Sequence, residues 1–350
     1  MKKIAIFQKD LGIGGIQRSL LNLLTNMDLT SYEVDLFLFA QPEICSFEDL
    51  NHINVYILKP LFYLNRVVSF NTLRKMFTYN LPDKEYDLAI DYNSYSNECA
   101  LCTFAVKAKK RIMWIHNDVE IEYKNSAKYR MLWRHFKSKF ERYDEFVAVS
   151  KGIVEPFRYM TGIKNKKITV IPNSINTLRL IQKSQEEIDF RVEPDITNFI
   201  FVGRFTHQKG IDILLDYFAR AVIKRPDIHL YLLGGGAEEL KITQQIQEQA
   251  LSDYVTVIPA VDNPYPYMAQ MDALVLTSRH EGQGMVLWEA KALGLDLIFE
   301  KHLEKYNDML MGTDDITGAI ISQKKHTKQF DSLDYYNINI KNSLYQLFDK

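Results

Sequence analysis

The stretch Glu281-Gly282-Gln283-Gly284-Met285-Val286-Leu287-Trp288-Glu289 decides the fold of this 350-residue chain. Its two carboxylates stand eight positions apart, with two glycines and the start of a helix-forming run between them. We expect Glu281 at the end of a strand, a tight turn over 282–284 and a helix from about Met285. Amides at such a helix N-terminus bind hydroxyls or an anionic group. The pattern fits a ligand rich in hydroxyl groups, although two solvated glutamates at a strand-turn-helix corner would have the same spacing.

The composition is that of a globular protein with room for two domains. Hydrophobic residues make up 47% and charged residues 25% of the chain, and the formal net charge of -1 argues against general nucleic-acid binding. Of the cysteines Cys45, Cys99 and Cys102, the last two form a C-x-x-C in an apolar stretch, which favours buried thiols over metal or redox chemistry. The N-terminal apolar run is too short for a signal peptide, and no run is long enough to span a membrane. We therefore expect a cytoplasmic protein.

Short apolar runs alternate with helical patterns, which predicts βαβ units and buried parallel strands. The expected strands are 4–7, 34–39, 87–90, 111–115, 145–149, 168–171, 199–202, 229–233, 255–258, 273–276 and 295–299. A polar stretch from Lys183 to Thr197 separates the two groups, and we interpret it as a linker. The predicted fold class is α/β, with two Rossmann-like doubly wound domains, residues 1–178 and 179–334, facing a central cleft.

Several motifs in order resemble one enzyme family. Residues 278–285 followed by Glu289-Ala290 and Ala292-Leu293-Gly294 resemble the E-x7-E signature of the retaining glycosyltransferases of family four, which have the GT-B fold. The further matches are Gly14-Gly15-Ile16, Trp114-Ile115-His116-Asn117, Ala148–Lys151, Val170–Ile175, Val202-Gly203-Arg204-Phe205 with Lys209-Gly210, and Leu232–Gly236. The resemblance implies transfer of a hexose or N-acetylhexosamine from a nucleoside-diphosphate sugar, most often a UDP-sugar, to a hydroxyl of a lipid-linked or polysaccharide acceptor. It also implies that a C-terminal helix, 335–350, crosses back to the first domain.

The resemblance assigns roles to the second domain. Arg204 and Lys209, in a loop with Gly203, would offset the charge of the donor diphosphate and stabilise the leaving nucleoside diphosphate. Because the chain has no D-x-D, we expect these cations to replace a metal ion, and we expect no cofactor. Glu281 is assigned to sugar positioning and electrostatics in a front-face reaction, and Glu289 to the ribose hydroxyls. The amides of Gly282, Gln283, Gly284 and Met285 would bind the distal hydroxyls of the sugar, while Trp288 is expected in the core.

In the first domain, a glycine loop and a histidine are the candidates. Gly12, Gly14 and Gly15 lie between the first strand and a helix, where backbone approaches a phosphate. In the resembling transferases this loop lies against the donor diphosphate and the acceptor, although a structural turn would look the same. His116 follows the strand 111–115 and would contact the donor sugar, with Asp118 as a secondary candidate. One departure from the family is the loop 299–302, which lacks glycine and puts donor contacts there in doubt.

The segment from Lys124 to Arg142 holds seven basic residues and one acid, interleaved with aromatic residues. Helical spacing puts Tyr129, Leu132, Trp133, Phe136 and Phe140 on one face. Two interpretations stay open: an interfacial helix on anionic lipid at the inner face of the cell membrane, or a core stripe with solvated cations behind it. The candidate acceptor or membrane face is Arg130, Trp133, Arg134 and Lys137. A second basic aromatic segment runs from Lys59 to Lys75.

Other classes of function also fit parts of the sequence. A sugar-nucleotide epimerase or hydrolase of the same fold would act on the donor without a glycosyl acceptor. A catalytically inactive nucleotide-sugar-binding module would keep the donor pocket, but Arg204, Lys209, Glu281 and Glu289 are all present. A nicotinamide-dependent dehydrogenase is disfavoured because the first glycine loop lacks the third glycine of the dinucleotide fingerprint.

Overall fold

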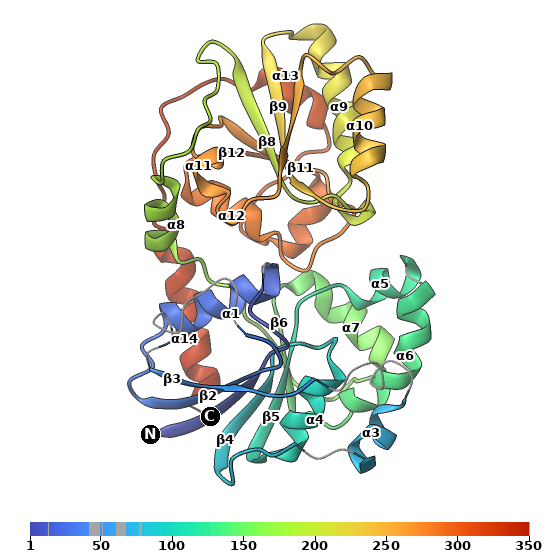
Figure 1. Cartoon of the computed structure of the whole chain (residues 1–350), viewed down its shortest axis with the longest axis vertical. Coiled ribbons are helices and arrows are strands. Elements are labelled where there is room, and N and C mark those ends of the chain that lie inside the picture. The colour runs from blue at the N-terminus through green and yellow to red at the C-terminus, as the bar shows by residue number, and fades with distance from the viewer. Residues whose placement is uncertain are drawn as a thin grey trace. The chain divides into compact units, whose positions relative to one another are not determined.

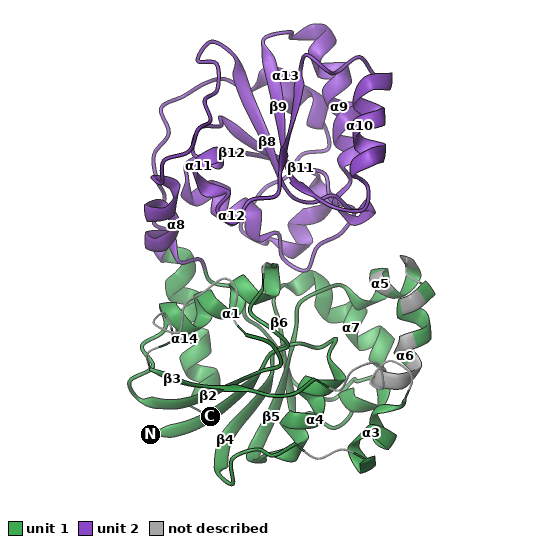
Figure 2. Cartoon of the chain, in the orientation of Figure 1, with its two compact units in different colours: residues 1–174, 335–350 green, residues 175–334 purple. Residues whose placement is uncertain are grey.

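The chain divides into two compact units (Figure 2). Unit 1 comprises residues 1–174 and 335–350, and unit 2 comprises residues 175–334. The structure, a computed structural model, describes residues 1–12, 14–41, 50, 52–60, 68–76, 79–125 and 127–349. Cys45, and residues 61–67 of the basic aromatic segment from Lys59 to Lys75, therefore lie outside the described residues.

Unit 1 contains a seven-stranded sheet in the order β3-β2-β1-β4-β5-β6-β7, and every neighbouring pair is parallel (Figure 1). Its strands are β1 Lys2–Phe7, β2 Tyr32–Leu38, β3 Ile53–Ile57, β4 Glu85–Asp91, β5 Lys107–Ile115, β6 Glu145–Ala148 and β7 Ile168–Val170. Its helices are α1 Gly15–Asn26, α3 Phe70–Met76, α4 Asn97–Ala105, α5 Val119–Asn125, α6 Ala127–Phe140, η2 Lys151–Ile153, α7 Val154–Thr161 and α14 Asp334–Phe348. The order of the strands reverses between β1 and β4, which is the doubly wound arrangement.

The sheet of unit 1 is buried on both faces, as parallel sheets require. Phe7, Phe37 and Tyr56 stack across three neighbouring strands, with ring centroids 4.7 and 4.8 Å apart. Cys99 and Cys102 on α4 are part of the same core and are fully buried. Burial raises the pKa of both thiols, so these cysteines are structural, as the apolar sequence around them predicts.

The last helix, α14, belongs to unit 1. It buries Tyr336, Ile340, Leu344, Leu347 and Phe348. Phe348 meets the ring of Tyr32 edge to face at 5.6 Å, and the Tyr336 hydroxyl donates to the carbonyl of Asn173 at 2.8 Å. Unit 1 is thus built from two separate parts of the sequence.

Unit 2 contains a five-stranded parallel sheet in the order β10-β9-β8-β11-β12. Its strands are β8 Thr197–Arg204, β9 Ile228–Gly235, β10 Val255–Pro259, β11 Ala273–Leu276 and β12 Asp296–Phe299. Its helices are α8 Thr177–Ser184, η3 His207–Lys209, α9 Ile211–Lys224, α10 Glu239–Glu248, α11 Tyr265–Met268, α12 Met285–Ala292, η4 Lys301–Tyr306 and α13 Ile316–Ser322. The predicted fold class, two doubly wound α/β halves, is confirmed.

Two local expectations differ from the structure. The polar stretch 183–197 is not a linker between the units but lies within unit 2. Phe190 in its middle packs on Tyr231 and Tyr267 at 5.4 and 5.0 Å, and Asn263 donates to the carbonyl of Lys183 at 2.8 Å. These contacts hold the segment within unit 2, although its polar composition alone suggests a linker. The strand β3 was not predicted, because it is a half-exposed edge strand.

Gly210 joins η3 to α9 and allows two loops of unit 2 to touch. Its φ is +63°, and a Cβ atom there would lie 2.1 Å from the carbonyl oxygen of Thr277. The carbonyl of Gly210 in turn accepts a hydrogen bond from the Thr277 hydroxyl at 2.8 Å. Only glycine fits this position, for both its conformation and its space.

We predict that Gly210→Ala destabilises the protein far more than Gly162→Ala. Gly162 has a φ of +77° but nothing within 4 Å of a built Cβ, so the control carries the backbone strain alone. That strain costs about 1–2 kcal/mol, whereas Gly210→Ala adds a backbone clash and should cost on the order of 3 kcal/mol or more. Urea unfolding of both variants measures the difference. Equal losses would show that the loop around Thr277 yields freely.

Candidate functional site

The carboxyl ends of β8 and β11 carry the main candidates of unit 2. These two strands are neighbours in the sheet, so the loops that follow them lie side by side. The first loop runs from Phe205 to Gly210 and includes η3, and the second runs from Thr277 to Gly284 before α12. In doubly wound sheets, ligands bind outside the carboxyl ends of the strands.

Lys209 and Glu281 meet across these two loops. The Nζ atom of Lys209 lies 2.7 Å from Oε1 of Glu281, and the two side chains are 16% and 7% exposed. The sequence supplied both residues as candidates but not this contact. The ion pair holds each of these largely buried side chains in one place.

Gly203 lies beside Lys209, and Gly234 lies where β9 comes close to β8. A Cβ on Gly203 would lie 3.3 Å from the ring of Phe201 and 3.8 Å from Cε of Lys209. A Cβ on Gly234 would lie 1.9 Å from the carbonyl oxygen of Gly203, so β9 also approaches β8 closely here. Arg204 ends β8 with its side chain exposed, and within the described residues no ion pair holds it.

Further hydrogen bonds join the two loops. The amide of Arg279 donates to the carbonyl of Gln208 at 2.8 Å, and the Gln208 side chain donates to the carbonyl of His280 at 3.1 Å. The ring of His302, in the glycine-free segment after β12, lies 3.0 Å from the carbonyl oxygen of Ser278. The sequence did not identify Gln208 or His302, because each acts through the backbone of a partner distant in the sequence.

Helix α12 begins at Met285, as predicted from the glycine turn. Glu289 is buried in its second turn, and Oε1 of Glu289 accepts a hydrogen bond from the hydroxyl of Tyr265 at 3.1 Å. Trp288 is in the core, as expected, and its indole donates to Asn307 at 3.2 Å. Gly284 lies in close contact with Leu287 and Asn307, which leaves little space for a side chain before the helix.

In unit 1, His116 follows β5 and is 5% exposed. Its ring lies 4.7 Å from the ring of Tyr92, and Nε2 of His116 has no hydrogen-bond partner among the described residues. Burial lowers the pKa of His116 to about 3. The imidazole is therefore neutral at physiological pH and suited to hydrogen bonding, not to donating a proton as an imidazolium.

Asp118 has a local structural task. One oxygen of Asp118 accepts hydrogen bonds from the amides of Glu120 and Ile121, both at 3.1 Å, at the start of α5. This is the hydrogen bonding of a helix cap. Asp118 is 1% exposed, and its role at the helix end accounts for its position after the strand.

The glycine loop precedes α1. Gly14 caps the helix in an extended conformation, and a Cβ there would lie 2.4 Å from Oε1 of Gln17. Asp10 organises the loop, because Oδ1 of Asp10 accepts from the Gln17 side chain at 2.7 Å and from the Gly12 amide at 3.2 Å. Gly15, the first residue of the helix, has open space around it. The N-cap residue Gly14 has no side chain, so it makes no side-chain hydrogen bond to the first amides of α1.

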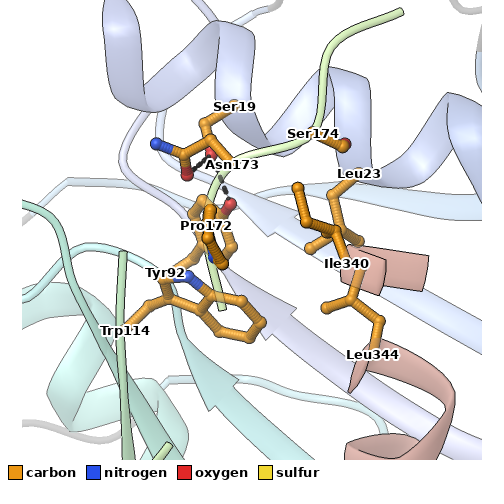
Figure 3. Close-up of a pocket in the computed structure, with 9 residues that line it drawn as sticks. All are labelled: Ser19, Leu23, Tyr92, Trp114, Pro172, Asn173, Ser174, Ile340 and Leu344. Atoms are coloured by element: carbon orange, nitrogen blue, oxygen red, sulfur yellow. Dashed lines mark hydrogen bonds between the residues drawn. The ribbon is translucent and has the colours of Figure 1, made fainter. Parts of the chain in front are cut away.

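A small cavity in unit 1 is lined by residues of this helix and by Tyr92 (Figure 3). The Ser19 hydroxyl on α1 lies 2.7 Å from the Tyr92 hydroxyl and also donates to the side chain of Asn173. Trp114 lines the same cavity, with its ring 5.0 Å from that of Tyr92. The ring that packs on His116 is thus held by α1 and by the segment just before unit 2.

The basic aromatic helix α6 corrects one prediction. Trp133 is 7% exposed, and its ring lies 5.9 Å from that of Tyr129 and 5.6 Å from that of Phe140. Trp133 is therefore a core residue and not part of a membrane or acceptor face. The described members of the stripe are buried because they cover the core of unit 1; the side chains of Leu132, Arg134 and Phe136 lie outside the description.

The cations of this segment are also partly structural. Lys139 is fully buried, donates to the carbonyl of Ser96 at 3.0 Å, and has a pKa that burial lowers to about 8. Arg130 donates to the carbonyls of Tyr123 and Lys124, at the end of α5, at 3.1 and 2.7 Å. Lys137 is exposed.

The described residues contain neither a membrane-spanning helix nor a cluster of metal ligands. None of the helices there combines the length and apolar character needed to cross a membrane. In the same ranges, no group of three or more His, Cys, Asp or Glu side chains is arranged to hold a metal ion.

Comparison with protein families identifies the class. Residues 13–179 match the model of Glycosyltransferase Family 4, and residues 183–336 match that of Glycosyl transferases group 1. The chain belongs to the family-four glycosyltransferases and has their GT-B fold, so the predicted resemblance is confirmed.

Individual relatives have low to moderate sequence identity to this chain. An N-acetylgalactosaminyltransferase of Campylobacter jejuni, named for a diphospho-undecaprenol-linked sugar, is 25% identical over 95% of this chain and 89% of its own. An uncharacterized glycosyltransferase of Methanocaldococcus jannaschii, MJ1059, is 28% identical over 54% of this chain, which spans only 47% of that relative. The solved structure of Anabaena Alr3699/HepE in complex with UDP and glucose matches with a TM-score of 0.69 at 16% identity, covering 100% of both chains.

We predict that His116→Gln changes how stability depends on pH. The folded pKa of about 3 lies below the unfolded value, so the unfolded chain binds more protons between about pH 3 and 6.5. Wild type should lose stability as pH falls below 6.5, by up to about 1.4 kcal/mol per pH unit from this residue, and the variant should lack that loss. Urea unfolding at pH 5, 6, 7 and 8 measures both proteins. Parallel curves would contradict a buried neutral imidazole.

Proposed function

We propose that this chain transfers a hexose or N-acetylhexosamine, with retention of anomeric configuration, from a UDP-sugar to a hydroxyl of a lipid-linked or polysaccharide acceptor. The observation that carries the proposal is the Lys209–Glu281 pair, on the loops after β8 and β11, beside the start of α12. The UDP and glucose of the HepE complex and the undecaprenol-linked sugar in the name of the Campylobacter relative support the donor and acceptor classes.

On the donor side, the exposed Arg204 and the partly exposed Lys209 supply positive charge for the diphosphate. Glu289, held by the Tyr265 hydroxyl, accepts hydrogen bonds from the ribose hydroxyls. The amides of residues 282–284 bind the distal hydroxyls of the sugar, and Gly203 and Gly282 place no side chain beside them. The amide expected from Met285 instead donates to the carbonyl of Gln283 at 2.9 Å.

In unit 1, we assign the loop with Gly14 and Gly15 to the donor diphosphate and the acceptor. The open space at Gly15 and the lack of a side chain on the N-cap residue Gly14 support this assignment. His116 contacts the donor sugar as a neutral hydrogen-bonding group, in keeping with its low pKa. Its unpartnered Nε2 is the atom available for that contact.

The chemistry requires the bond between the anomeric carbon and the diphosphate oxygen to break while negative charge grows on the leaving UDP. Lys209 and Arg204 stabilise that charge, and the acceptor oxygen attacks the same face of an oxocarbenium-like centre as its proton passes to the leaving oxygen. Glu281 lies close to the positive charge that develops on the sugar and is itself held by Lys209. No covalent glycosyl-enzyme is needed in this route.

Acceptors of the proposed class are carried in membranes, so we place the chain at the cytoplasmic side of the cell membrane as a peripheral protein. Because Trp133 is buried, contact with anionic lipid falls to the exposed cations Arg130 and Lys137, with Arg134 on the same helix. This contact is electrostatic and weakens as salt rises.

We predict that Lys209→Ala lowers kcat at saturating donor by about 10²–10³-fold, because the charge on the leaving diphosphate loses a stabilising partner. Transfer from the preferred UDP-sugar is assayed together with thermal unfolding. Lys241→Ala is the matched control, since Lys241 is 78% exposed on α10 and its ion pair lies on the surface. Near-normal turnover of the Lys209 variant would remove this lysine from the mechanism.

The donor class and the role given to the cations are tested together. We expect UDP-sugars to bind more tightly than GDP- or dTDP-sugars in calorimetry, and transfer to persist in EDTA, because Arg204 and Lys209 replace a metal ion. Equal binding of all nucleotides would reject the UDP assignment. Loss of transfer in EDTA that magnesium or manganese restores would reject the metal-free mechanism. Donor hydrolysis with every acceptor tried would favour a hydrolase.

A further inference from the structure

Arg279 is two positions before Glu281 and grips the loop that carries Lys209. Its guanidinium donates from Nη1 to the carbonyl of His207 at 2.7 Å. The same group forms two hydrogen bonds to Asp212, from Nη1 to Oδ1 at 2.9 Å and from Nη2 to Oδ2 at 2.6 Å. His207 and Asp212 flank Lys209 in the sequence, so one side chain holds the segment on both sides of the lysine.

The geometry is that of a fork-to-fork pair, which fixes orientation as well as distance. Asp212 lies in the first turn of α9, where a carboxylate also interacts favourably with the helix N-terminus. Hydrogen bonds from Arg279 hold the pKa of Asp212 below its usual range, so the carboxylate stays ionised. The pair therefore persists over the working pH range of an enzyme.

The pair contributes little to global stability. The side chains of Arg279 and Asp212 are 26% and 46% exposed, and ion pairs that share water in this way stabilise proteins weakly. The two loops are already joined by the contact between Gly210 and Thr277 and by the backbone hydrogen bond to Gln208. What the pair adds is a fixed position for the segment 207–212 relative to residue 281.

We propose that Arg279 and Asp212 form a positioning clamp that sets the place of Lys209 opposite Glu281, and that the clamp is required for full turnover although Arg279 itself carries no chemical step. This inference rests on the proposed function of Lys209 and Glu281. A misplacement of about 1 Å at a reacting group can cost 10²-fold in rate, so a small shift of η3 is enough to matter.

The test compares four variants and a control in the full chain. Arg279→Gln and Asp212→Asn remove the charge pair; Arg279→Lys keeps the charge but cannot form the fork. The double variant Arg279→Asp with Asp212→Arg reverses the pair. Arg220→Gln is the control, because Arg220 lies on α9 and contacts only its own helix, through Asp216 and Tyr217, in the interactions described. Kinetics with the UDP-sugar, UDP binding by calorimetry and thermal midpoints are measured.

We expect kcat to fall about 10- to 100-fold in Arg279→Gln and Asp212→Asn, less in Arg279→Lys, and not measurably in Arg220→Gln. The midpoints of unfolding should stay within a few degrees of wild type, and the reversed pair should recover part of the lost kcat. A purely structural pair would instead lower the midpoint and leave kcat of the folded enzyme unchanged. If the Gln variant does not fold, Arg279→Lys carries the comparison.

The proposal is overturned if Arg279→Gln and Asp212→Asn stay within twofold of wild type, or if the reversed pair is no better than the single variants. Lys209→Ala separates this failure from failure of the role assigned to Lys209, and absence of sugar transfer by wild type would instead reject the proposed function. Loss of activity in Lys209→Ala with full activity in Arg279→Gln rejects the clamp alone. Full activity in Lys209→Ala rejects the role assigned to Lys209, and the clamp then has nothing to position.

Discussion

The contact between Lys209 and Glu281 joins two loops that are 72 residues apart in the chain and adjacent in the sheet. Burying either charged group without its partner would be costly, so the surrounding structure must hold the two together. β8 and β11 pair directly, Gly210 lets their loops touch, and Thr277 and Gln208 bond across the gap. Each of these features makes sense as a means of keeping one ion pair in one geometry.

Unit 1 arranges polar groups differently. Unit 2 pairs opposite charges, whereas the carboxyl end of β5 in unit 1 carries a histidine that burial keeps uncharged. Tyr92 packs on that histidine and is fixed by Ser19, which in turn is bonded to Asn173 at the end of the first chain segment of the unit. A neutral donor and acceptor of hydrogen bonds suits a sugar hydroxyl, while the cations of unit 2 suit a phosphate.

Periodicity in the sequence predicts the elements whose side chains are buried on a regular pattern. The buried strands and the helix from Met285 follow that rule, whereas β3, half exposed at the edge, does not. Contacts between residues distant in the sequence do not follow from periodicity, so the sequence does not predict the Arg279–Asp212 pair, although Arg279 lies within the stretch 278–285. Amphipathic spacing likewise could not decide whether Trp133 packs against a membrane or against the protein core, because both environments bury an apolar stripe. In the structure Trp133 is buried in the core.

The return of α14 to unit 1 has a consequence for synthesis. Unit 2 is inserted, as residues 175–334, into the chain of unit 1, so the ribosome completes all of it before α14 is made. During that interval Tyr32 and the other residues that α14 covers have no partner helix, and apolar surface stays open to water. Because translation adds roughly 5–20 residues per second, the nascent first unit waits on the order of ten seconds or more in an unfinished state that chaperones would recognise.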